Sequence, residues 1–106
     1  MDALFGSRVR TDVLIAVGRL GSAYVSELAR LLDKRPIEVQ RAVLSLERAG
    51  ILETRVVGKV RMVELNPRFP EYQQLAEMLL TMSERPLYAG KWKMQRRRPR
   101  AMGKAG

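Results

Sequence analysis

Apolar side chains recur at intervals of three and four residues in several stretches of the chain, which is the spacing of one face of an α-helix. Ser7 is placed to cap the first stretch and Ser26 the second, and Pro36 stands in the first turn of the third, where proline is best tolerated. The pattern therefore predicts four helices, over residues 8–20, 27–32, 36–49 and 72 to about 83.

Two runs rich in β-branched residues follow the third predicted helix. Residues 51–57 and 60–65 are joined by Gly58-Lys59, and glycine in the first position of a two-residue loop suits a type II′ hairpin turn. Pairing Val57 with Val60 places alternate side chains on the core side of the hairpin. That inward set is Leu52, Val56, Val63 and Leu65.

The predicted elements follow one another in the order of a winged helix-turn-helix. A short helix, the turn Asp33-Lys34-Arg35, a longer helix and an immediate hairpin predict a mainly α fold with a small β-hairpin (α+β), ordered helix-helix-helix-wing-helix. The third helix has the right width for the ~12 Å major groove of DNA, and the hairpin can reach the neighbouring backbone or minor groove. Winged helices also serve as protein-protein modules, so a protein-interaction adaptor is the alternative.

Positive charge is concentrated at the C-terminal end of the chain. Residues 1–84 hold 12 Lys or Arg and 11 Asp or Glu, whereas residues 85–106 hold 8 and 0. We predict a winged-helix domain over 1–84 and a basic tail over 85–106 that is disordered when free, because it has no apolar periodicity. Such a tail indicates nucleic acid or an anionic membrane surface as partner. Within it, Tyr88 and Trp92 either stack on unpaired bases or dock back on the domain.

Several functional classes are excluded by composition. Cysteine and histidine are both absent, which removes disulfides, thiolate metal sites and imidazole bases. No Gly-rich phosphate loop or Ser-x-x-Lys motif occurs, so we expect no enzyme, no metal and no cofactor. Apolar runs fall far short of the ~20 residues that span a bilayer, and the N-terminus lacks the pattern of a secretion signal. We therefore expect a cytoplasmic, nucleoid-associated protein without a membrane partner.

Several motifs between residue 4 and about residue 82 match one family in their order and spacing. They are Leu4-Phe5-Gly6-Ser7-Arg8, Tyr24-Val25-Ser26-Glu27-Leu28-Ala29-Arg30-Leu31-Leu32, the spacing of Val39, Arg41, Leu46, Ala49, Gly50, Ile51 and Leu52, and Leu65-Asn66-Pro67. Through these motifs the chain resembles the MarR/ArsR-like winged-helix regulators of bacteria and archaea. The resemblance implies a transcriptional regulator that acts as a dimer on a partly palindromic operator, with residues 36–49 in the major groove. We expect repression by occlusion.

Candidate DNA-binding residues lie on the outward face of the third predicted helix and in the turn before it. Glutamine suits an adenine edge and arginine a guanine edge, while Ile37 and Leu44 fit thymine methyl groups or, equally, a protein surface. Lys34 and Arg35 replace the small N-cap typical of the family, and two cations beside a helix N-terminus suggest a bound phosphate, with two solvated charges as the alternative. The full set is Lys34, Arg35, Ile37, Gln40, Arg41, Leu44, Ser45 and Arg48.

Four further groups complete the candidate sites. Wing cations are placed for phosphate or minor-groove contact, or else keep an edge hairpin soluble. Residues at the entrance to the second helix either bond a phosphate or serve as core and cap. Tail cations grip nucleic acid, in the adaptor alternative without sequence preference, and surplus apolar residues in the first and fourth helices predict a homodimer. The wing cations are Arg55, Lys59 and Arg61, and the residues at the entrance to the second helix are Tyr24 and Ser26. The tail cations are Lys91, Lys93, Arg96, Arg97, Arg98 and Arg100. The surplus apolar residues are Leu14, Ile15, Met78, Leu80 and Met82.

Overall fold

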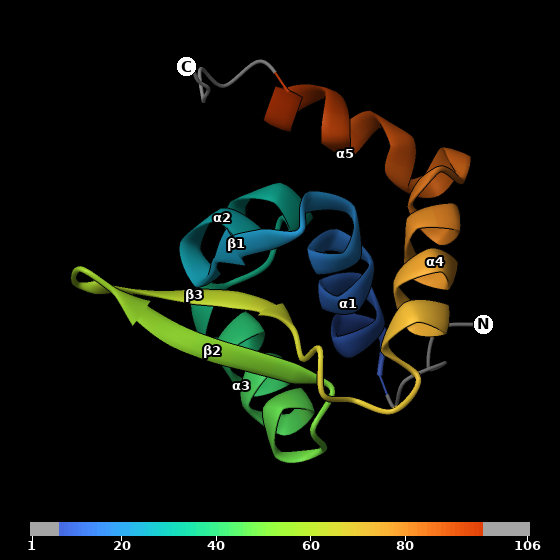
Figure 1. Cartoon of the computed structure of the whole chain (residues 1–106). Helices are drawn as coiled ribbons and strands as arrows, with labels where there is room; N and C mark the ends of the chain where they lie inside the picture. Colours follow the sequence, from blue (N-terminus) through green and yellow to red (C-terminus); the bar gives the residue numbers. More distant parts are fainter. Residues whose placement is uncertain (1–6, 97–106) are drawn as a thin grey trace.

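The computed structural model describes residues 7–96, with side chains up to residue 92. Four helices stand where the apolar pattern predicts them, and two strands form the predicted hairpin (Figure 1). The mainly α fold with a small hairpin is therefore confirmed. No helix within residues 7–96 is long and apolar enough to cross a bilayer. The elements in chain order are α1 Arg8–Leu20, β1 Ser22–Tyr24, α2 Val25–Leu32, α3 Pro36–Arg48, β2 Leu52–Val57, β3 Val60–Leu65, α4 Tyr72–Ser83 and α5 Pro86–Arg96.

The ends of α1 and α2 are set by local hydrogen bonds. The Ser7 hydroxyl accepts from the Arg10 backbone N–H at 3.1 Å, which confirms Ser7 as the N-cap of α1. The backbone N–H of Tyr24 donates to the Glu27 carboxylate at 3.0 Å, so the N-cap of α2 is Tyr24. Ser26 lies inside the first turn with an exposed side chain, and its prediction as the cap is therefore wrong.

The turn between α2 and α3 is formed by a left-handed residue. Asp33 has φ 56 and ψ 50, a conformation that a short polar side chain tolerates. Its neighbour Lys34 donates its backbone N–H to the Ala29 carbonyl at 2.9 Å. Pro36 is the first residue of α3. Proline is tolerated there because backbone N–H groups in the first turn make no hydrogen bond within the helix.

The hairpin belongs to a three-stranded antiparallel sheet in the order β1-β3-β2. Val57 pairs with Val60 as predicted, and Gly58 adopts φ 64, as the first residue of a type II′ turn requires. Val56 was expected to face the core, but its side chain is 68% exposed, because the hairpin tip extends beyond the helices. The pairing of β1 with β3 was missed, since three residues are too short to show a period of two.

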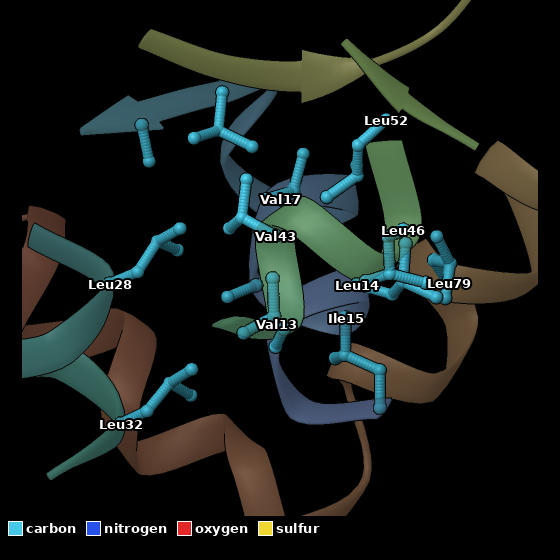
Figure 2. Packing of buried hydrophobic residues seen from close by; sticks show 14 of the residues in the cluster. Val13, Leu14, Ile15, Val17, Leu28, Leu32, Val43, Leu46, Leu52 and Leu79 are labelled. Carbon is cyan, nitrogen blue, oxygen red and sulfur yellow. The ribbon is translucent and has the colours of Figure 1, made fainter. Parts of the chain in front are cut away.

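Helix α1 runs through the centre of the core. Figure 2 shows its side chains meeting those of α2, α3, β2 and α4. Leu14 and Ile15 are fully buried and Met82 is buried as well, so these three side chains cannot form the surface of the predicted dimer. Met78 and Leu80 remain exposed, at 41% and 43%. Because they are two residues apart, they lie on opposite flanks of the buried stripe of α4.

The fifth helix is held against the domain by two hydrogen bonds from aromatic side chains. The Tyr88 hydroxyl donates to Asp12 Oδ1 at 2.6 Å, and the Trp92 indole N–H donates to the Ser83 carbonyl at 2.6 Å. Both rings are buried in the common core, and they stack with centroids 6.4 Å apart. The prediction of disorder is therefore wrong for Pro86–Arg96, and the alternative in which Tyr88 and Trp92 dock on the domain is confirmed.

Candidate nucleic-acid interface

The exposed face of α3 carries most of the candidate residues assigned to it. Gln40, Arg41 and Arg48 are exposed, as are Ile37 and Leu44. The opposite face, with Val39, Ala42, Val43 and Leu46, packs in the core. A helix anchored along one side thus presents a continuous outward surface of two apolar, one amide and two cationic side chains.

Ser45 was expected on this outward surface, and the structure places it elsewhere. Its side chain is half-buried, and its hydroxyl accepts a hydrogen bond from Arg10 Nη1 at 3.1 Å. Ser45 therefore ties α3 to α1. The bond supports the orientation of α3 but does not point to a ligand.

A groove of about 570 Å³ lies between α3, the start of α2 and the hairpin. It brings together three groups of candidate residues that are separate in the sequence, namely those at the start of α2, on α3 and on the hairpin. Five lining residues were not among the candidates, because their proximity depends on how the hairpin lies against α3. Those predicted are Tyr24, Ser26, Gln40, Leu44, Lys59 and Arg61, and those missed are Val25, Pro36, Val43, Glu47 and Val60.

A chain of hydrogen bonds fixes the hairpin beside α3. Arg61 Nη1 donates to the Thr54 hydroxyl at 3.0 Å, and that hydroxyl donates to the Glu47 carboxylate at 3.0 Å. Arg61 is therefore oriented by bonds that lead through Thr54 to Glu47, which lines the same groove. Glu47 is missing from the sequence-based candidates because its role depends on this cross-element contact.

The three wing cations do not converge. Lys59 is exposed at the hairpin tip and lines the groove together with Arg61. Arg55 pairs in the sheet with Met62, on the face opposite Arg61, and its Nε lies 2.8 Å from the Glu64 carboxylate. The groove therefore presents two of the three predicted wing cations.

The cations of the turn have carboxylate partners within the chain. Lys34 Nζ lies 3.9 Å from Asp12 Oδ2 with its side chain only 23% exposed, while Arg35 lies 3.8 Å from Glu38 in a mostly exposed pair. Asp12 and Glu38 therefore offset part of the positive charge from which a bound phosphate was inferred, and phosphate binding by Lys34 and Arg35 stays a prediction. Arg35 remains open to solvent, whereas Lys34 is largely covered.

Asp12 is the centre of a buried polar cluster that the sequence did not indicate. Its carboxylate lies 3.6 Å from Arg8 Nε, near Lys34, and accepts from Tyr88. Burial of the Tyr88 phenol, and then its hydrogen bond to Asp12, raise the pKa of Tyr88 to about 12. The cluster joins α1, the turn before α3 and α5 at one carboxylate.

Helix α5, which carries Lys91, is separated from α3 by the body of the domain. Helix α5 packs against α2 and α4, and it lies along the top of Figure 1 with α3 at the bottom. Lys91 is half-buried on α5. The side chains of Lys93 and Arg96, and all of Arg97, Arg98 and Arg100, lie outside the described residues, as do Leu4, Phe5 and Gly6 of the first resemblance motif.

No protein-family model matches the sequence, and no curated protein matches it. Solved structures do share its fold. The adhesin competence repressor AdcR of Streptococcus pyogenes superposes with a TM-score of 0.61 over 85% of this chain, at 16% identity. The antimony-specific transcriptional repressor AntR gives 0.55 over 73% at 25% identity, and HlyU of Vibrio cholerae gives 0.58 over 76% at 20% identity.

The chain spans 66% of AdcR, 66% of AntR and 76% of HlyU, so the first two chains extend well beyond the matched part. AdcR and AntR are described as repressors, and the fold that they share with this chain agrees with the winged-helix fold predicted from the sequence. The chain thus has the fold of these two repressors.

Proposed function

We propose that this protein is a sequence-preferring double-stranded DNA-binding transcriptional regulator. The observation that carries the proposal is the groove in which the helix-two entrance, α3 and the hairpin meet, with the exposed face of α3 continuing from it. A DNA backbone in that groove would meet Lys59 and Arg61 on the hairpin side. Helix α3 would then stand in the adjacent major groove.

Base recognition is assigned to the polar groups on the exposed face of α3. Gln40 carries a donor and an acceptor that match adenine, and Arg41 carries a donor pair that matches guanine. Both are exposed and lie on a helix fixed to the core along its other side, so their positions are defined before DNA arrives. Repression by occlusion is the mode we propose, because AntR and AdcR, which share the fold, are described as repressors.

A homodimer on a partly palindromic site completes the proposal. Met78 and Leu80 leave apolar surface on the two flanks of α4, away from the groove. A symmetric dimer would place two copies of α3 about one DNA turn apart, roughly 34 Å. The part of the basic tail beyond Arg96 would add backbone contacts.

Selection from a random duplex library tests this function directly. We expect enrichment of a palindromic sequence whose half-sites are separated by about 10 base pairs, because two symmetric recognition helices read equivalent half-sites. Recovery of unrelated sequences at equal affinity would contradict it. The exposed apolar pair Ile37 and Leu44 would then favour the rival function, a winged-helix adaptor that binds protein through α3.

A further inference from the structure

Two large apolar side chains stand at the centre of the exposed face of α3. Ile37 is 47% exposed and Leu44 is 48% exposed. They are seven residues apart, about two helical turns, so they project within ~20° of one another. The core does not require them, because the buried stripe of α3 is complete without them. Exposing two such side chains on one line calls for an apolar contact with a partner.

The surroundings of this pair indicate what that partner is. Leu44 lines the groove beside Gln40 and Val60, while Arg41 and Arg48 are exposed outside the groove lining. The apolar surface is therefore a narrow strip flanked by an amide and by cations. A strip of this kind fits an anionic surface that carries small apolar groups among hydrogen-bonding edges.

The major groove of DNA has that composition. Each A·T pair presents the N7 and N6 groups of adenine together with the C5-methyl group of thymine, and phosphates line both sides of the groove. Glutamine and leucine one helical turn apart can therefore meet the two halves of one base pair.

Building on the DNA-binding function proposed above, we infer that α3 distinguishes thymine by its methyl group, with Leu44 and Ile37 as the residues that contact it. Gln40 bonds the paired adenine edge, so the same pair is read twice. Loss of the methyl group then weakens binding without removing any hydrogen bond.

Uracil substitution isolates the methyl group, because uracil keeps every hydrogen-bonding atom of thymine. Each thymine of the duplex enriched by selection is replaced in turn, and the affinity of the full-length protein is measured at one salt concentration. We expect about fourfold weaker binding for each contacted methyl group, the equivalent of one buried methylene. Substitutions at thymines outside the α3 contacts should leave affinity unchanged.

A double-mutant cycle assigns the effect to the side chain. Leu44→Ala should bind the thymine and uracil duplexes equally at the position that Leu44 contacts. Leu87→Ala is the control, since Leu87 is an exposed leucine on α5, outside the groove lining and outside the proposed dimer surface, and it should keep the full uracil effect. Both positions are on the surface, so neither variant is expected to unfold.

The possible outcomes distinguish a failure of methyl recognition from a failure of the proposed DNA-binding function. An enriched palindrome bound equally well with uracil at every position would overturn methyl recognition and leave sequence-preferring binding intact. A uracil effect that persists in both Leu44→Ala and Ile37→Ala would also overturn it. If no sequence is enriched, the DNA-regulator function fails, and methyl recognition fails with it.

Discussion

Arg41 and Asp12 mark two different uses of charge in this protein. Arg41 is exposed on the outward face of α3, where a guanidinium remains free to bind an external group. Asp12 is buried and shared among Arg8, Lys34 and Tyr88, where it organises the fold. Formal charge in the sequence does not distinguish these roles. They are distinguished by the burial of each side chain and by its distance to charged and hydrogen-bonding partners.

Replacement of Arg41 tests base recognition at a single position. Arg41→Ala should lower affinity for the selected duplex by about 1–3 kcal/mol and barely change affinity for random duplex, since a base contact is lost while phosphate contacts remain. Fluorescence anisotropy at one salt concentration measures both. Arg30→Ala, an exposed arginine on α2 outside the groove lining, is the control. An equal loss on both duplexes would show that Arg41 contacts only the backbone.

Tyr88 makes stability depend on alkaline pH. Its pKa is raised from 10.0 to about 12 in the folded chain, so its contribution is complete below pH 10 and is lost as pH rises toward 12. Deprotonation would place a phenolate beside the Asp12 carboxylate, and the two negative charges would repel each other. We expect the free energy of unfolding, measured in urea, to fall across this window in the wild type.

Tyr88→Phe provides the comparison for that experiment. The variant should lose about 1–3 kcal/mol below pH 10, since a buried hydrogen bond to Asp12 is removed. Above pH 10 the difference between the two proteins should shrink. Lysine deprotonation affects both proteins alike, so a constant difference across the window would contradict the assignment.

At the scale of the elements, the close packing of α1 on α4 requires a residue without a side chain at position 18, which is Gly18. A Cβ atom on Gly18 would lie 2.6 Å from the Leu79 Cβ atom, both within packed helices. Gly18→Ala should therefore destabilise the protein by about 1–3 kcal/mol despite the better helix propensity of alanine.

The matched control lies in α5, where Gly90 has nothing within 4 Å of a built Cβ atom. Gly90→Ala should be neutral or stabilise by up to about 1 kcal/mol. Chemical denaturation of both variants measures the contrast. Equal effects at the two positions would show that α1 and α4 can separate to admit a methyl group.

The helices that were predicted correctly are those with long apolar periodicity, such as α1 and α3. Helix α5 was missed because Tyr88 and Trp92 are the large side chains that it buries up to residue 92, and a single spacing of four within a basic stretch does not establish a period. Pro86 at its first position was the local signal available. Strand β1 forms only because β3 offers it an edge, which no local pattern reveals.

The candidate site was predicted in parts and assembled only by the structure. The outward set on α3 follows from helical period alone, except for Ser45 at its margin. The contacts between residues distant in the sequence could not be predicted from it. They are Arg61 with Thr54, Thr54 with Glu47, and Lys34 with Asp12. These contacts depend on how the hairpin and α1 lie against α3, and side-chain periodicity carries no information about that.

At the scale of the whole molecule, the dimer remains a proposal with a direct test. We expect sedimentation equilibrium at roughly tens of micromolar to give twice the chain mass. Met78→Glu and Leu80→Glu, made separately, should identify which flank of α4 forms the contact. The variant on the interface flank should give the monomer mass, because the dimer would bury its carboxylate. A monomer mass for the wild type would overturn the dimer.

The contribution of the tail is tested by a truncation that preserves α5. Ending the chain at Arg96 removes Arg97, Arg98, Arg100 and Lys104 while keeping the buried Tyr88 and Trp92. Since each phosphate contact adds ~0.9 to the slope of log affinity against log salt, the slope should flatten by roughly two to four. Specific and random duplexes should weaken together. An unchanged slope would assign the tail to another partner.

Trp92 is the single tryptophan of the chain, and it lies in α5 with its indole N–H bonded to Ser83. Its emission therefore reports the docking of that helix, whereas far-ultraviolet circular dichroism reports all the helices at once. If α5 opens ahead of the rest, the two signals will part during denaturation, and if the domain unfolds as one unit they will coincide. The molecule thus carries an unlabelled optical probe of its own C-terminal helix.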